Sequence, residues 1–279
     1  MLATRILTAL VLVALVLASL FLLPPVGWGL VTLAGIALGA GEWANLAALP
    51  RPAWLLFVAG AVLIGGNLLF SPLAGFDRGW PDGVVIAVCA PAALFWLFAA
   101  PAWLGNLWRP RSPLLLAIVG WLLLIAAWVA LVELQARSPW LALAAMAIVW
   151  VADIAAYFAG RAFGRRKLAP SISPGKTWEG VYGALAAVFA YAIALLPFAA
   201  AAGYTRALTL PAISTWLALA LVLAALSVVG DLFESLLKRQ AGVKDSGTLL
   251  PGHGGMLDRI DALLAALPLA ALAALAFLR

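Results

Sequence analysis

Acidic residues are scarce in this sequence of 279 residues, and their spacing points to metal binding. Five of the eleven Asp and Glu residues fall between positions 231 and 261, namely Asp231, Glu234, Asp245, Asp258 and Asp261. If the segment GDLFESLLKR is helical, Asp231 and Glu234 share one face, and Ser235 and Lys238 lie beside them. Asp258 and Asp261 have the same spacing of three, just before an apolar run. Two carboxylate pairs therefore flank one short polar segment.

These carboxylates have two interpretations. Ion pairs such as Glu234 with Lys238 would stabilise a helix by about 0.3–0.5 kcal/mol. Excess acid near anionic lipid phosphates is unfavourable, however, unless a hard cation lies between them. Oxygen ligands without clustered His or Cys favour Mg²⁺ over zinc or copper. We therefore interpret Asp231, Asp258 and Asp261 as magnesium ligands, and ion pairing stays open for Glu234.

A glycine-rich loop joins the two acidic pairs. In KDSGTLLPGHGGMLDR, His253 is surrounded by Gly247, Gly252, Gly254 and Gly255. Glycines allow backbone N–H groups to converge on a phosphate, and Lys244 and Arg259 supply positive charge. The alternative is a plain turn that sets where the last span re-enters the membrane. His253, the only histidine, either holds this loop or acts as a general base.

A second polar segment, residues 160–180, carries basic residues. Its motif SISPGKTWEG predicts a turn at Ser173–Gly175 and a helix that Thr177 caps, so Lys176 would meet a phosphate at the helix N-terminus. The alternative is that Lys176 is an ordinary basic loop residue. Upstream, Asp153 lies at the end of a predicted span, and a basic run typical of cytoplasmic loops follows it.

The elements that position these residues are membrane helices. The sequence is 66% hydrophobic and 10% charged, with a mean hydropathy of +1.12, which excludes a soluble globular domain. Apolar runs predict nine spans, near residues 6–23, 26–41, 54–70, 84–107, 114–132, 140–159, 181–202, 213–230 and 262–278. The fourth span carries Pro91 and Pro101, and a proline kink is tolerated in a membrane helix when neighbouring helices satisfy the freed carbonyls. The predicted fold is all-α and polytopic, with N-terminal helices in residues 1–139 and the region that carries the site in residues 140–279.

The distribution of charge predicts the sidedness. With a cytoplasmic N-terminus, 13 of the 17 Lys and Arg residues face the cytoplasm, and the exceptions are Arg78, Arg137, Arg206 and Arg279. Both polar segments then lie on the cytoplasmic face. No basic domain is present to bind nucleic acid, so the net charge of +6 is assigned to this bias. Tryptophans near the span ends are expected to be interfacial anchors, namely Trp43, Trp54, Trp80, Trp103, Trp108, Trp140 and Trp178.

The segment between the acidic pairs resembles a family signature. SLLKRQAGVKDSGTLLPGHGGMLDRID, residues 235–261, is similar to the signature of the phosphatidate cytidylyltransferases, the CDP-diacylglycerol synthases. GDLFES before it, SPGKTWEG and the DxxAYxxGRxxG-like stretch at residues 153–164 also resemble elements of that family. The resemblance covers the C-terminal half, whereas the first 150 residues carry only hydropathy.

This resemblance implies condensation of CTP with phosphatidic acid, giving CDP-diacylglycerol and pyrophosphate at the cytoplasmic face. It implies Mg²⁺ and a second cation, with the carboxylate ligands Asp153, Asp231, Glu234, Asp258 and Asp261. Catalysis is expected to involve Asp231, Asp258, Asp261 and Lys238. The residues expected to bind phosphates are Lys176, Ser235, Arg239, Lys244, His253 and Arg259. The expected setting is the bacterial inner membrane, with lipid as a partner, no nucleic acid, and a homodimer as a further expectation.

Two other functions stay open from the residues alone. CTP-dependent lipid kinases resemble this family distantly and would transfer the γ-phosphoryl group instead. A transporter would place carboxylates such as Asp153 near the middle of the bilayer. The acids gather at one face and the sequence shows no inverted repeat, which favours the cytidylyltransferase.

Overall fold

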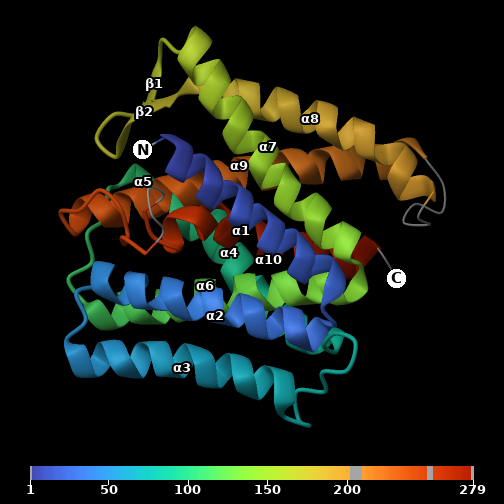
Figure 1. Cartoon of the computed structure of the whole chain (residues 1–279). Helices are drawn as coiled ribbons and strands as arrows, with labels where there is room; N and C mark the ends of the chain where they lie inside the picture. Colours follow the sequence, from blue (N-terminus) through green and yellow to red (C-terminus); the bar gives the residue numbers. More distant parts are fainter. Residues whose placement is uncertain (1, 202–208, 250–253, 278–279) are drawn as a thin grey trace.

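The fold is a bundle of long helices with one small β-hairpin (Figure 1). The computed structural model describes residues 2–201, 209–249 and 254–277. Its helices are α1 (Leu2–Leu22), α2 (Pro25–Leu46), α3 (Arg51–Phe70), α4 (Asp82–Leu94), the π-helical turn η1 (Phe95–Ala99), α5 (Ala100–Gly105), α6 (Pro113–Arg137), α7 (Pro139–Phe163), α8 (Trp178–Ala201), α9 (Leu210–Gln240) and α10 (Leu257–Phe277). Strands β1 (Lys167–Ala169) and β2 (Ser173–Thr177) pair antiparallel between α7 and α8.

The membrane fold predicted from the sequence is confirmed. Eight of the described spans are long and apolar enough to cross a membrane, and they coincide with the second to ninth predicted spans. The first predicted span falls on α1, of which Leu10–Leu22 forms a shorter apolar helix. Within the described residues, the β-hairpin is the departure from an all-helical chain.

The fourth span contains a π-helical turn between its two prolines. α4 continues into the π-helical turn η1 and then into α5. Pro91 and Pro101 flank this turn, and a proline has no N–H to bond the carbonyl four residues earlier. The wider turn accommodates the missing bonds without ending the helix.

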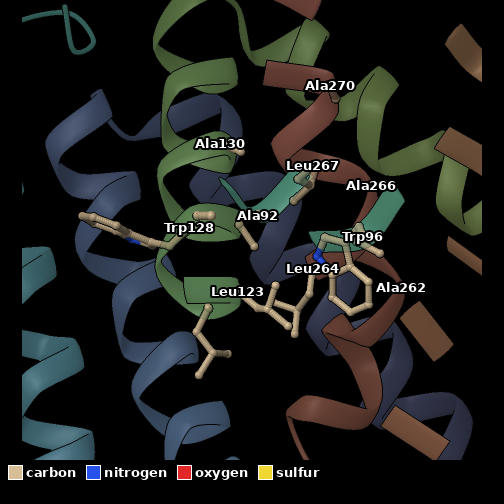
Figure 2. Close-up of a cluster of buried hydrophobic side chains, with 14 of the residues drawn as sticks. Ala92, Trp96, Leu123, Trp128, Ala130, Ala262, Leu264, Ala266, Leu267 and Ala270 are labelled. Carbon is tan, nitrogen blue, oxygen red and sulfur yellow. The ribbon is translucent and has the colours of Figure 1, made fainter. Parts of the chain in front are cut away.

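The centre of the bundle is formed by α4, α6 and α10, which pack against one another. Figure 2 shows small and branched side chains meeting there, with Ala92 of α4, Leu123 of α6 and Leu267 of α10 in one buried cluster. Small residues let membrane helices approach closely where no hydrophobic force drives them together. α3 and α8 are the least buried of the eight spans, so they form the periphery.

Several tryptophans join helices within the protein, contrary to the prediction that they are interfacial anchors. Trp43, Trp80 and Trp103 are buried. The indole N–H of Trp43 donates to the carbonyl of Leu116 at 2.8 Å, which bonds α2 to α6. Indole groups make the same kind of bond from α3 to α2 and from α6 to α3. In hydrocarbon an indole N–H needs a partner, and a helix carbonyl has a second lone pair to offer.

One end of the bundle gathers the polar segments. α1 begins there, and the β-hairpin, the C-terminal end of α9 and the start of α10 lie at the same end, whereas α10 ends at the other (Figure 1). α9 has 31 residues and therefore a length of about 46 Å, which exceeds a hydrocarbon core of about 30 Å. The two segments that contain the candidate residues are thus brought together by the course of α7 to α10.

Candidate active site

The β-hairpin carries Lys176 to the side of α9. Antiparallel pairing of β1 with β2 places the turn at residues 170–172. The predicted turn at Ser173–Gly175 is wrong, because these residues lie in β2, where Ser173 pairs with Ala169 and Thr177 with Lys167 around an irregularity in the register. The predicted cap is confirmed, since Thr177 Oγ1 accepts the N–H of Gly180 at 3.2 Å where α8 begins.

The first acidic cluster, defined as Asp153, Asp231 and Asp261, brings three helices together near Lys176. The Nζ of Lys176 lies 2.5 Å from Oδ2 of Asp231. Asp153 of α7 and Asp261 of α10 are close enough to Asp231 and Lys176 for their charges to interact. The Ser235 hydroxyl donates to Oδ1 of Asp231 at 3.3 Å. Residues from α7, β2, α9 and α10 thus meet in one place.

Gly230 allows the two helices beside this cluster to touch. A Cβ at this position would lie 2.6 Å from the carbonyl oxygen of Asp261 and 2.8 Å from the Cβ of Ala265. Any larger residue would therefore push α10 away from α9. In the motif GDLFES, the glycine that lets α10 approach directly precedes Asp231.

The second acidic cluster, Glu234 and Asp258, closes around Lys238. Lys238 pairs with Glu234 one turn before it in α9, and its Nζ lies 2.5 Å from Oδ1 of Asp258. Oδ2 of Asp258 accepts the backbone N–H groups of Ser246 at 3.0 Å and Gly255 at 2.8 Å. The ion pair considered for Glu234 is present, and Asp258 holds the loop against the first turn of α10.

The other predicted phosphate-binding residues lie around the same end of the bundle. Nε of Arg239 donates to the carbonyl of Ile172 at 3.2 Å, which ties α9 to the turn of the hairpin. Lys244 is exposed in the loop after α9, and Arg259 is exposed in the first turn of α10. His253 lies outside the described residues, so both of its predicted roles stay predictions.

Glu42 belongs to this site, although the sequence interpretation does not include it. This residue of α2 is only 8% exposed and accepts hydrogen bonds from the loop that precedes α10. A carboxylate near the end of an apolar span is a functional candidate by default, and that signal is present in the sequence. Its partners, however, lie 204 to 215 residues away along the chain, a separation that local spacing does not reveal.

Comparison with known proteins decides the family. The chain matches the model of the cytidylyltransferase family over residues 3–277. It belongs to this family. It is 42% identical over 278 residues to a phosphatidate cytidylyltransferase of Pseudomonas aeruginosa, covering 96% of this chain and 95% of that protein. It is 36% identical over 297 residues to a phosphatidate cytidylyltransferase of Haemophilus influenzae, covering 96% of each chain.

The match confirms the resemblance seen in the C-terminal half and extends it to the first 150 residues. In this member of the cytidylyltransferase family, the N-terminal helices supply Glu42 to the site. The first half of the chain is therefore part of the site and not only its support in the membrane.

The carboxylates of this cytidylyltransferase-family protein have the donor chemistry of a magnesium site. Within the described ranges, no three His, Cys, Asp or Glu side chains gather tightly enough to form a complete metal cage. Mg²⁺ does not require one, since it is usually bound by one or two carboxylates together with phosphates and waters. Asp231 and Asp261 offer such oxygens. Glu234 and Asp258 converge on the ammonium group of Lys238, so these two carboxylates already surround one positive charge.

Proposed function

We propose that this protein transfers the cytidylyl group of CTP to phosphatidic acid, giving CDP-diacylglycerol and pyrophosphate for phospholipid synthesis. The observation that carries the proposal is the meeting of Lys176 with the first acidic cluster in a chain whose relatives, matched over nearly their whole length, are named phosphatidate cytidylyltransferases. A protein with eight long apolar spans is also suited to a lipid substrate that stays in the bilayer.

The proposed transfer exchanges one phosphate linkage for another. An oxygen of the phosphatidate phosphate attacks the α-phosphorus of CTP, the bond from that phosphorus to the oxygen bridging to the β-phosphate breaks, and pyrophosphate leaves with the electron pair. A phosphate monoester is already ionised near neutral pH, so the attack requires no dedicated base. The main obstacle is repulsion between two anions, which preorganised positive groups offset.

We assign to the basic residues the role of offsetting this repulsion between the two anionic substrates. Lys176 lies where the hairpin meets α9, and we assign its ammonium group to a substrate phosphate. The further residues assigned to phosphates are Ser235, Arg239, Lys244, His253 and Arg259. Lys238 is assigned to holding Asp258 in place and to the charge balance of the second acidic cluster.

The carboxylates are assigned to cations. Mg²⁺ bound by Asp231 and Asp261, with Asp153 beside them, would neutralise part of the charge on the triphosphate. We assign the second cation to Glu234 and Asp258, where it would replace the ammonium group of Lys238, which occupies the point on which the two carboxylates converge. These assignments support a site that gathers two anionic substrates at one end of the bundle.

Labelled CTP is expected to identify the reaction type. With purified protein, Mg²⁺ and phosphatidic acid, phosphorus label at the α position should enter a lipid, and label at the γ position should leave as pyrophosphate. Omitting phosphatidic acid is the control, and it should abolish both signals. Label from the γ position appearing in the lipid would identify a CTP-dependent lipid kinase and contradict the proposal.

We also propose that the protein lies in the bacterial inner membrane with its site facing the cytoplasm. The relatives come from bacteria. The start of α1, the hairpin and the α9–α10 loop lie at one end of the bundle, which agrees with the charge bias of the sequence (Figure 1). The association of two copies stays a prediction from the sequence.

Cysteine labelling is expected to report this sidedness. Cysteines in place of Arg166 and Lys244 should react with an impermeant maleimide from the cytoplasmic side only, and one in place of Asp77 from the opposite side only. All three positions are exposed, and the native Cys89 is buried and can be replaced by Ala beforehand. Right-side-out and inside-out vesicles provide the two sides. Labelling of positions 166 and 244 from opposite sides would dismantle the proposed site.

A further inference from the structure

Glu42 links the first half of the chain to the site. We infer that Glu42 is a positioning residue for the transfer, because its carboxylate holds the loop and the first turn of α10 that present Asp258 and Asp261. The kinetic consequence of this inference rests on the proposed function. The hydrogen bonds of Glu42 from which it is inferred do not depend on that function.

The Glu42 carboxylate caps α10 from a different helix. Oε1 accepts the N–H of Met256 at 2.9 Å, and Oε2 accepts the N–H of Leu257 at 2.7 Å. N–H groups at the start of a helix have no partner within the helix, and a negative charge beside them is stabilised by the helix dipole. Since α10 begins at Leu257, the Glu42 carboxylate fixes the position of the first turn of α10.

Ser246 connects the same carboxylate to Asp258. The Ser246 hydroxyl lies 2.9 Å from Oε2 of Glu42 and 3.0 Å from Oδ2 of Asp258. A hydroxyl has one proton, so it is donated to one of these carboxylates at a time. Asp261 follows Asp258 by one helical turn, so a displacement of the first turn of α10 moves both acidic residues.

Two glycines of the signature make room for Glu42. A Cβ at Gly247 would lie 2.5 Å from Oε1 of Glu42, and a Cβ at Gly255 would collide with the same carboxylate and with the hydroxyl of Ser246. Neither glycine has a positive φ, so the lack of space beside Glu42 requires glycine there, and the backbone conformation does not. This assigns to Gly247 and Gly255 a contact with Glu42 in place of the phosphate contact considered from the sequence.

Replacement of Glu42 tests the inference through kcat and through amide exchange. Glu42→Gln keeps one acceptor oxygen but places an amide group against a backbone donor, so we expect kcat to fall about tenfold while KM for CTP changes less than about threefold. Hydrogen exchange of the Met256 and Leu257 amides should accelerate in this variant. Glu133→Gln is the matched control, because Glu133 is also a buried carboxylate that accepts a backbone N–H, that of Trp80, at the other end of the bundle.

A double-mutant cycle tests the contact with glycine. Gly247→Ala alone should lower kcat about tenfold, because its methyl group displaces the Glu42 carboxylate. Added to Glu42→Ala, which removes that carboxylate, the same change should lower kcat less than about twofold further. The cycle is therefore expected to be strongly non-additive.

Two results would overturn the inference. One is a Glu42→Gln protein with wild-type kcat and unchanged exchange at residues 256 and 257, and the other is an additive cycle between Glu42 and Gly247. A wild-type protein without cytidylyl transfer would instead contradict the proposed function. In that case the amide exchange of Glu42→Gln and Glu133→Gln still decides whether Glu42 holds the start of α10.

Discussion

Asp231→Asn and Asp261→Asn are each expected to lower the turnover of cytidylyl transfer more than about 100-fold, which corresponds to a loss of roughly 2.7 kcal/mol of transition-state stabilisation. Both carboxylates belong to the first acidic cluster, and Asp231 carries the ion pair with Lys176. Asparagine keeps the shape and one carbonyl oxygen but removes the charge that a hard divalent cation prefers. The measurement is turnover at saturating Mg²⁺ with purified variants.

The control for these variants is Asp77→Asn, which changes an exposed acid at the other end of the bundle. It should leave turnover unchanged. Thermal stability in detergent should also stay near that of the wild type in Asp231→Asn and Asp261→Asn. Nearly full turnover in a folded Asp261→Asn protein would remove that residue from the proposed cation site.

Asp258 differs from these two residues in what its replacement disturbs. Its carboxylate pairs with Lys238 and accepts the N–H groups of Ser246 and Gly255, so it holds the loop as well as offering oxygens to a cation. Stability and turnover are both coupled to this position. Replacement of Asp258 is therefore expected to lower thermal stability as well as turnover, whereas replacement of Asp231 or Asp261 is expected to lower turnover alone.

Lys176→Met is expected to lower kcat/KM for CTP about 100-fold. The change removes the ammonium group that pairs with Asp231, and the carboxylates of the first acidic cluster would then repel the triphosphate without compensation. Lys176→Arg keeps the charge but not the compact ammonium group, so a partial recovery is expected. Steady-state kinetics with varied CTP provides the measurement.

Lys167→Met is the matched control for this prediction. Lys167 is exposed and lies on the paired strand of the same hairpin. Its replacement by Met therefore removes one positive charge from the hairpin and leaves the first acidic cluster intact. Its kcat/KM should stay within about twofold of the wild type, as for a surface charge. Equal losses in the two variants would show that Lys176 acts only through the net charge of the hairpin.

Much of the membrane architecture can be predicted from the sequence because a span is a local signal. Each crossing requires about 20 apolar residues in succession, and proline marks where a helix is interrupted. The i, i+3 spacing of Asp231 and Glu234 likewise follows from helix geometry, and α9 continues through both. The Thr177 cap is another local pattern, and it is present.

The features that sequence analysis misses depend on tertiary contacts. The strands at residues 167–169 and 173–177 are too short for a periodic signal, and a Ser-Pro-Gly sequence is equally typical of a turn. The burial of Trp43 depends on the packing of α6 against α2, since a tryptophan near a span end suits either a lipid interface or a helix contact. The hydrogen bonds of Glu42 depend on the return of the chain to α2 after 204 to 215 residues.

The length of α9 has a consequence for the depth at which the chemistry takes place. If one boundary of a hydrocarbon core about 30 Å thick lies at Leu210, where α9 begins, the core is crossed in about 20 residues and the other boundary falls just before Asp231. The phosphate of a membrane lipid lies just outside that boundary. Moving an acyl chain into water costs about 0.8 kcal/mol for each CH₂ group, and at this depth no chain has to leave the leaflet. Only the water-soluble nucleotide then has to travel to the site.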